Sequence, residues 1–507
     1  MVEVRGSYVR RLPDGRELYV VPDLPMERLR EVATKGLQQP QTAAQLLDLS
    51  YGIRGELSVH SSVLREVFLA TRDAALKAVD PVNAVKNHVR LEGEILRIGG
   101  RTYDLRNYEN VYVAGIGKAS VQMAQGLQEV LVDRITEGVV NTSYGSSRTV
   151  RLDRIRINEV AHQAPDQAGV DGSKEIIALA QKAGERDLFL FVVSGGGSDT
   201  FLAPVEPDIE VYKRFISDLK KIIGRIDLIN CVRKKVDTVK GGQLARLIFP
   251  ADGAVLILSD VKGDPLSIIA SDPTAPDDST FPDAARVLEM MDAESGFVPA
   301  SVREQVRKGV AGEIPETPKE GNPIFSKTQN LLVGNNSMAL EAARERLVRG
   351  GLGVEVMPEP VDGEADAFAD TLVARAEELS KTITKPTVIL AGGEVKFRVN
   401  PDSTGQGGRG STLALAVAKR ISGTGNIAFM AFGTDGVDYY AGHGGAMSDG
   451  STIKEIAGAG ILLDDRVVYG DSYVPLDKIN ASILCEPTGT NVMDVYMMVV
   501  MPRMMHL

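Results

Sequence analysis

The sequence predicts an α/β fold with a mostly parallel sheet, because short apolar runs lead repeatedly into glycine turns and alternate with helical segments. Leu188–Val193 is short enough to be a strand buried on both faces, and Ser194–Ser198 follows it directly. Asn110–Ala114 leads in the same way into the turn Gly115–Ser120. Ala254–Leu258 is a third apolar run, and it ends in Ser259-Asp260-Val261. Helical segments at 121–132 and 171–182 alternate with these strands.

We expect three parts along the chain. Residues 1–55 form an N-terminal extension, where Ser7–Arg11 and Glu17–Val21 flank a Pro-Asp-Gly turn and predict a hairpin. Residues 56–385 carry the strands and helices named above. Residues 386–507 follow a Thr-Lys-Pro boundary and repeat the alternation, so they predict a second, smaller α/β domain.

The composition excludes several classes of protein. The chain has 57 Lys and Arg against 68 Asp and Glu, a net charge of −11, which argues against general nucleic-acid binding. Two cysteines are too few for a disulfide framework, which suits a cytoplasmic location. The N-terminus lacks a signal-peptide pattern and no apolar run approaches a membrane span, so no membrane partner is expected. The sequence leaves a homo-oligomer open.

The glycine-rich segment after the first apolar run predicts an anion site. It consists of Ser194, Gly195, Gly196, Gly197 and Ser198. Without Cβ atoms, backbone N–H groups can converge on an anion, and ligands of open parallel sheets bind at the carboxyl ends of the strands. A tight turn that binds nothing is the alternative for a single short motif.

Three basic side chains are candidates for binding an anionic substrate. Lys118 follows a two-glycine turn at a strand end, where a lysine can reach an anion, although a solvated lysine is the stronger reading of that motif alone. Arg233 and Lys240 belong to a basic segment that makes a local positive field in an acidic protein. A solvated basic helix face explains that segment equally well.

Acidic residues at strand ends are candidates for a metal site. Asp260 and Asp264 follow the strand Ala254–Leu258, and Asp435 follows another predicted strand. Such carboxylates beside phosphate loops commonly hold Mg²⁺, while turn-capping aspartates are the common alternative. His162 lies in a promising turn, although a lone histidine is more often structural than catalytic.

Arg409 lies in the glycine-rich loop before a predicted helix. Its planar guanidinium can bind a carboxylate or phosphate through two parallel hydrogen bonds.

Taken together, the motifs resemble the class II glycerate 2-kinases, a family with a C-terminal MOFRL domain whose members are often labelled hydroxypyruvate reductase. The resemblance extends from about residue 60 to residue 500. It rests on the number, order and spacing of these blocks: GIGKAS, EVAHQAPD, VSGGGSDTFLAP, NCVRKKVDTVKGGQLA, LILSDVKGDPLSIIASDPTAPDDSTFPDA, PETPK, GEAD, LAGGEVKF, GQGGRGSTLALA, FGTDGVD and EPTGTNVMD.

The resemblance implies a fold and an activity. It implies a Rossmann-like domain, a smaller MOFRL-type α/β domain and a cleft between them. It also implies transfer of the γ-phosphoryl group of ATP to the 2-hydroxyl of glycerate or a related small sugar acid, with Mg²⁺. The catalytic lysine of the family falls on Lys118 and the catalytic arginine on Arg409, while Ser194–Ser198 looks like an anion-binding wall. Such a set of charges and glycine loops is adequate for phosphoryl transfer.

The sequence departs from the family pattern near these residues. Asp199 and Thr200 follow the glycine loop where small residues are usual, and Gly410, Ser411 and Thr412 replace a larger Asn, Gln and Glu. We expect these smaller side chains to leave room for acids larger than glycerate. Two alternatives stay open: a hydroxypyruvate reductase, weakened because Gly115–Ser120 ends in serine where a dinucleotide fingerprint needs glycine or alanine, and a non-catalytic protein that binds a sugar acid.

Overall fold

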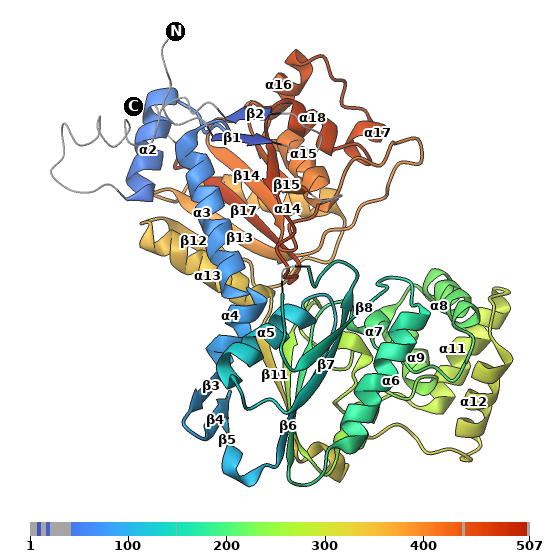
Figure 1. The fold of residues 1–507 in the computed structure, drawn as a ribbon. Coiled ribbons are helices and arrows are strands. Elements are labelled where there is room, and N and C mark those ends of the chain that lie inside the picture. The colour runs from blue at the N-terminus through green and yellow to red at the C-terminus, as the bar shows by residue number, and fades with distance from the viewer. Residues whose placement is uncertain (1–7, 12–16, 21–41, 149, 439–441, 504–507) are drawn as a thin grey trace. The chain divides into compact units, whose positions relative to one another are not determined.

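The computed structural model describes residues 8–11, 17–20, 42–148, 150–438 and 442–503 (Figure 1). These residues form two compact units. The parallel-sheet unit contains residues 79–335 and 489–491, and the mixed-sheet unit contains the described parts of 1–78, 336–488 and 492–507. The units group residues by contact, and the domain bounds expected from the sequence, 1–55, 56–385 and 386–507, remain a prediction.

The parallel-sheet unit is built from alternating strands and helices. Its strands are β3 (Val89–Glu92), β4 (Ile95–Ile98), β5 (Arg101–Asp104), β6 (Asn110–Ile116), β7 (Glu137–Ser143), β8 (Ile155–Val160), β9 (Asp187–Val193), β10 (Asp252–Leu258) and β11 (Thr328–Gly334). Its α-helices are α4 (Pro81–His88), α5 (Ser120–Leu131), α6 (Gln167–Lys182), α7 (Gly197–Thr200), α8 (Ile209–Ile223), α9 (Ile226–Lys235), α10 (Gln243–Ile248), α11 (Phe281–Ala293) and α12 (Ala300–Val310).

The central sheet of this unit has the strand order β11-β10-β9-β6-β7-β8, and every neighbouring pair is parallel. The predicted α/β fold with a mostly parallel sheet is therefore confirmed. From β6 the chain adds β7 and β8 on one side, then returns beside β6 with β9 and adds β10 and β11 on the other. The strand order thus reverses between β6 and β9, which in open α/β sheets is where ligands bind.

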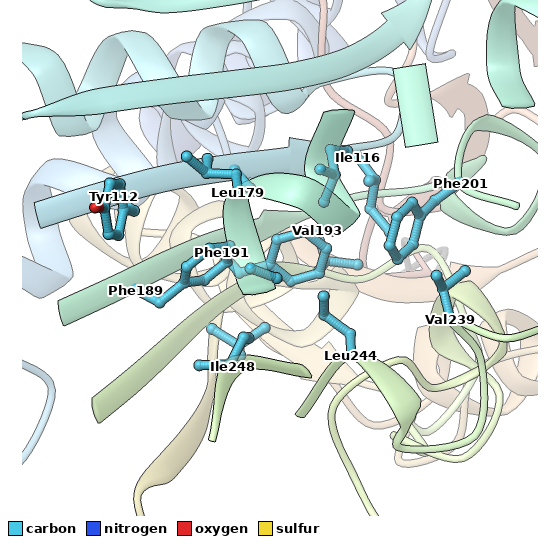
Figure 2. Close-up of a cluster of buried hydrophobic side chains, with 14 of the residues drawn as sticks. Tyr112, Ile116, Leu179, Phe189, Phe191, Val193, Phe201, Val239, Leu244 and Ile248 are labelled. Atoms are coloured by element: carbon cyan, nitrogen blue, oxygen red, sulfur yellow. The ribbon is translucent and has the colours of Figure 1, made fainter. Parts of the chain in front are cut away.

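The core explains why β9 is apolar throughout its length. All seven of its residues are buried. Phe189, Phe191 and Val193 point into one cluster, where they pack with Leu244 and Ile248 of α10 (Figure 2). The intervening residues of the strand are buried on the opposite face. A central strand covered by helices on both faces therefore reads as a continuous apolar run rather than as an alternating pattern.

The mixed-sheet unit has a second six-stranded sheet with the order β12-β13-β17-β14-β15-β16. Its strands are β12 (Gly353–Val356), β13 (Thr387–Gly393), β14 (Ile427–Gly433), β15 (Gly442–Asp449), β16 (Ser482–Cys485) and β17 (Asp494–Val500), with β1 (Tyr8–Arg11) and β2 (Glu17–Val20) as a separate pair. Its helices are α2 (Ala43–Arg54), α3 (Ser62–Ala78), α13 (Asn336–Arg349), α14 (Ala365–Ser380), α15 (Arg409–Ile421), α16 (Thr452–Gly458), α17 (Asp465–Val468) and α18 (Tyr473–Lys478).

The last strand completes this second sheet. β17 inserts between β13 and β14 and runs antiparallel to both, so that Asp494 pairs with Gly393 on one side and with Gly433 on the other. The N-terminal strands β1 and β2 are antiparallel, as the hairpin signal predicts, and the turn between them lies outside the described residues. In the part of the chain that the structure describes, no helix is long and apolar enough to cross a bilayer.

The packing of β9 predicts a large loss of stability when its aromatic core is truncated. Phe191 is fully buried, with its ring centroid 6.1 Å from that of Phe201. Phe191→Ala should lower the free energy of unfolding by about 3–5 kcal/mol, because it removes buried surface and leaves a cavity. Met290→Ala on α11, where the side chain is 48% exposed, should change it by less than about 0.5 kcal/mol. Urea unfolding of both variants measures the difference, and equal losses would contradict this account of the core.

Candidate functional site

The reversal of strand order brings two glycine loops to the same edge of the parallel sheet. Ile116 at the end of β6 pairs with Val193 at the end of β9, and Val193 pairs with Ile257 of β10. The segments that follow these three strands carry Lys118, the glycine loop Ser194–Ser198 and Asp260. These three segments are far apart in the sequence, but they begin at the same edge of the sheet because the ends of their strands are paired.

Backbone and hydroxyl hydrogen bonds hold the two loops together. The Lys118 N–H donates to the carbonyl of Gly195 at 2.9 Å, and the N–H of Ala119 donates to the Ser194 hydroxyl at 2.9 Å. The Gly117 N–H donates to the Thr200 hydroxyl at 3.0 Å. Gly117 has a φ of 100°, and a Cβ there would overlap the carbonyl oxygen of Ser194. Only glycine lets the two backbones come this close.

The loops leave hydrogen-bond donors unused. Within the described chain, the backbone N–H groups of Gly195 and Gly196 donate to no acceptor, and the Lys118 ammonium forms no hydrogen bond or ion pair. A cation and two adjacent N–H groups beside a glycine turn match what an anion needs, since successive backbone N–H groups form a concave anion-binding surface. The arrangement agrees with the predicted roles of Lys118 and the glycine loop, which remain predictions.

A histidine lies against the glycine loop. A Cβ on Gly196, whose φ is 83°, would come within 2.5 Å of His162 Cδ2, 2.7 Å of His162 Nε2 and 3.4 Å of Lys118 Cγ. Burial lowers the pKa of His162 to about 4, and the positive charge of Lys118 adds to the effect. The imidazole is therefore neutral at physiological pH. The sequence pointed to this turn without indicating which groups surround it.

Arg233 and Lys240 lie behind the glycine loop and are almost completely buried. Arg233 donates to Asp199 at 2.6 Å and to the Ser198 carbonyl at 3.1 Å. Lys240 donates to the carbonyls of Ser198 at 2.9 Å and Phe201 at 2.5 Å, and burial lowers its pKa to about 8. The structure thus gives both cations internal contacts that hold the loop, whereas their predicted role in binding substrate or phosphate remains a prediction.

Two of the three predicted metal ligands lie in the parallel-sheet unit. Asp260 lies against Gly195, where a Cβ would overlap its carboxylate, and Asp264 accepts a hydrogen bond from Asn335 at 2.6 Å. Among the described residues, no group of three or more His, Cys, Asp or Glu side chains is arranged to hold a metal ion. Mg²⁺ keeps several waters and is usually bound by one or two carboxylates together with substrate phosphates. Asp260 and Asp264 have the carboxylates that such a site uses, and their role as metal ligands remains a prediction.

Asp435 belongs to the mixed-sheet unit, so neither unit contains all three predicted metal ligands. Its carboxylate accepts a hydrogen bond from the N–H of Val437 at 3.0 Å, the turn-capping contact that the sequence left as the alternative. A Cβ on Gly433 would come within 3.4 Å of carboxylate oxygens of both Asp435 and Asp494. The edge formed by the ends of β14 and β17 is therefore acidic.

Arg409 is the first residue of α15, and two carboxylates contact its guanidinium. Arg409 Nη2 lies 2.9 Å from Glu394 Oε1, and its Nε lies 3.3 Å from Asp494 Oδ2. The Arg409 side chain is 39% exposed, so it is only partly covered. Burial raises the pKa of Asp494 to about 7 even though Arg409 opposes the shift. Glu394 and Asp494 lie within the blocks LAGGEVKF and EPTGTNVMD that carry the family resemblance, but the sequence did not single out either residue as part of the site.

The residues after Arg409 are packed rather than open. Ser411 and Thr412 are almost completely buried, and their hydroxyls lie 2.9 and 3.1 Å from the hydroxyl of Ser472. Asp438 accepts hydrogen bonds from the N–H groups of Gly410 and Ser411 at the start of α15. Ser472 and Asp438 thus occupy the space around these small residues, while the acceptance of acids larger than glycerate stays a prediction.

Known proteins share this arrangement of two regions. Residues 67–307 match DUF4147, a domain of unknown function, and residues 387–494 match the MOFRL family. A glycerate 2-kinase of Pyrococcus horikoshii is 35% identical over 441 residues, which cover 86% of this chain and 97% of that protein. A putative hydroxypyruvate reductase of Agrobacterium vitis is 32% identical, covering 85% of this chain and 93% of the relative.

A solved structure has the same fold. The crystal structure of a glycerate kinase from Thermotoga maritima superimposes with a TM-score of 0.75 at 31% sequence identity. The match covers 86% of this chain and 99% of that one.

The close approach of the two loops predicts that a methyl group at Gly117 is poorly tolerated. Gly117→Ala must displace the Ser194 carbonyl, which should cost about 1–3 kcal/mol beyond the strain of the left-handed backbone. Gly312→Ala is the matched control, because Gly312 also has a left-handed φ, 74°, and nothing lies within 4 Å of the added atom. Thermal unfolding compares the two. If both variants lose the same stability, the contact at Gly117 is looser than described.

Proposed function

Because the chain belongs to the glycerate 2-kinase family, which combines a DUF4147 region with a MOFRL region, we propose that it phosphorylates the 2-hydroxyl of glycerate. The phosphoryl donor in this proposal is ATP and the metal ion is Mg²⁺. A related small sugar acid is the wider form of the same substrate class. A cytoplasmic location and a homo-oligomer remain predictions.

The observation that carries the proposal lies at the reversal of strand order. Among the described residues, the Lys118 ammonium has no partner and the N–H groups of Gly195 and Gly196 donate to no acceptor, and Lys118 Cγ lies beside Gly196. Phosphoryl transfer depends mainly on positioning and on stabilising charge that spreads over the phosphoryl oxygens. A fixed cation and fixed N–H donors supply that stabilisation without reorganising during the reaction. The hydrogen bonds between the two loops keep these donors in one arrangement.

Asp260 and Asp264 are the side chains that would hold Mg²⁺ in this unit. When bound with a nucleotide, the ion would supply neutralisation of charge on the phosphate oxygens. Arg409 in the mixed-sheet unit would donate to a carboxylate or phosphoryl group. Its contacts with Glu394 and Asp494 fix the orientation of the guanidinium.

The reductase alternative finds less support in the first glycine turn. Ser120 stands where a dinucleotide fingerprint needs glycine or alanine, and its buried hydroxyl donates to the Asn141 carbonyl at 2.9 Å. The position is thus filled by a side chain that bonds to β7. A putative hydroxypyruvate reductase among the relatives keeps this alternative worth measuring.

The proposal is tested with the purified full-length chain. One assay supplies ATP, Mg²⁺ and a panel of three- to six-carbon hydroxy acids, and ³¹P NMR identifies which hydroxyl is phosphorylated. A second assay supplies NADH and hydroxypyruvate. Formation of 2-phosphoglycerate only in the first assay supports the kinase. Oxidation of NADH without phosphoryl transfer would establish the reductase, and ligand binding without turnover in either assay would indicate a binding protein.

Lys118→Ala should reduce kcat by about 10²-fold or more, because it removes a charge contact that stabilises the transition state. Lys86→Ala is the control in the same unit, since Lys86 forms an exposed ion pair with Glu129 on the surface. Circular dichroism verifies that both variants fold. A folded Lys118→Ala variant with turnover within a few-fold of the wild type excludes a catalytic role for Lys118.

Arg409→Lys should reduce kcat/KM about ten-fold or more, because a hydrogen bond to a charged group is worth about 1.5–3 kcal/mol and lysine cannot form two parallel ones. Arg344→Lys on α13 is the control, because Arg344 forms a comparable pair with the exposed Glu341. Full activity in Arg409→Lys would remove Arg409 from the site.

A further inference from the structure

The imidazole of His162 occupies a position that the contacts described so far do not explain. Its Cδ2–Nε2 edge lies over Gly196. Lys118 Cγ lies 3.4 Å from the position that a Cβ on Gly196 would take. Among the residues that the structure describes, none forms a hydrogen bond with the His162 ring. The side chain is half-buried, so its free nitrogen can reach a ligand as well as water.

We propose that His162 is a further catalytic residue, whose imidazole accepts a hydrogen bond from the acceptor hydroxyl and takes its proton during phosphoryl transfer. This inference rests on the proposed kinase function. The hydroxyl oxygen forms a bond to the γ-phosphorus of the nucleoside triphosphate, and the bond from that phosphorus to the leaving oxygen breaks, releasing the diphosphate. The hydroxyl proton moves to the imidazole, and the imidazolium then releases it to water.

The surroundings of His162 suit this role. Burial and Lys118 keep the ring neutral, so an unshared electron pair is available to accept a proton. The other charged groups that influence the ring are Asp199, which favours the imidazolium, and Lys220, which disfavours it. A loose transition state requires little removal of the proton before the phosphoryl group arrives, so the main demand on the base is orientation. A ring packed against Gly196 meets that demand.

A purely structural role predicts different results from a catalytic one. His162→Phe keeps a ring of similar size over Gly196 but removes both nitrogens. Its kcat should fall by about 10²–10⁴-fold, the usual contribution of general base catalysis. Its dissociation constant for ATP should change less than about three-fold, because in this proposal His162 contacts the acceptor hydroxyl and not the nucleotide. His162→Gln restores a hydrogen-bond acceptor and should recover part of the lost kcat.

His88→Phe is the matched control. His88 is another partly buried histidine of the same unit, and its Nδ1 contacts the Ala84 carbonyl at 2.8 Å at the end of α4. Its variant should keep the kcat of the wild type.

NMR of the wild-type protein provides a readout that does not depend on turnover. The chain has five histidines, so the imidazole ¹⁵N signals can be assigned with His162→Gln. The His162 ring should remain neutral at about pH 6, where an unperturbed histidine is mostly protonated. Its signals should shift when D-glycerate is added without nucleotide.

The outcomes separate this inference from the proposed function. If the wild type phosphorylates glycerate and His162→Phe retains its kcat, the role of His162 is overturned while the kinase stands. Unchanged His162 signals at saturating glycerate overturn it as well. If the wild type phosphorylates no hydroxy acid, both proposals fail together. Loss of kcat with unchanged nucleotide binding, together with the ligand-induced shift, supports the catalytic role.

Discussion

The contact between two stretches of bare backbone determines the rest of the candidate site. Gly117 and Ser194 approach so closely that no side chain fits between them, and the Lys118 N–H bonds to the Gly195 carbonyl. This contact uses some of the polar groups of the two loops, and among the described residues it leaves the N–H groups of Gly195 and Gly196 without an acceptor. Lys118 follows Gly117 directly, while His162 and Asp260 lie against Gly196 and Gly195 of the same pair of loops. The parallel pairing of β6 with β9 is what brings the two stretches together.

The buried cations behind the glycine loop show why a basic segment is ambiguous in sequence. Arg233 and Lys240 read equally well as a solvated helix face or as ligands for an anion. Their acceptors, the Ser198 and Phe201 carbonyls and Asp199, lie more than 30 residues earlier in the chain. Burying a charge is unfavourable unless it is paired and hydrogen-bonded. These pairs therefore form only once the loop has folded, and no local pattern could reveal them.

The parts of the fold that could be predicted are those encoded locally. Leu188–Val193 is an apolar run that ends in glycines, and it is β9 within one residue at its start. The apolar runs before Lys118 and Asp260 predict β6 and β10 in the same way, so the sequence also places these two residues just after strand ends. Asp494 could not be found in this way, because its neighbours Gly393 and Gly433 belong to strands about 100 and 60 residues away. The packing at Ser411 was hidden for the same reason, since its partner Ser472 comes from a distant segment.

Lys118 and Arg409 differ in their electrostatic surroundings, and this difference suits them to different roles in binding an anion. Lys118 has no carboxylate partner among the described residues, so it can attract an anion from solution. Arg409 already contacts Glu394 and Asp494, so its charge is largely compensated and it adds little long-range attraction. Arg409 still has a fixed orientation, because two carboxylates hold the plane of its guanidinium. With a pKa of about 7, Asp494 is partly protonated near neutral pH, and each protonation leaves Arg409 with more uncompensated charge. Arg409 is thus better suited to orient a bound group than to capture one.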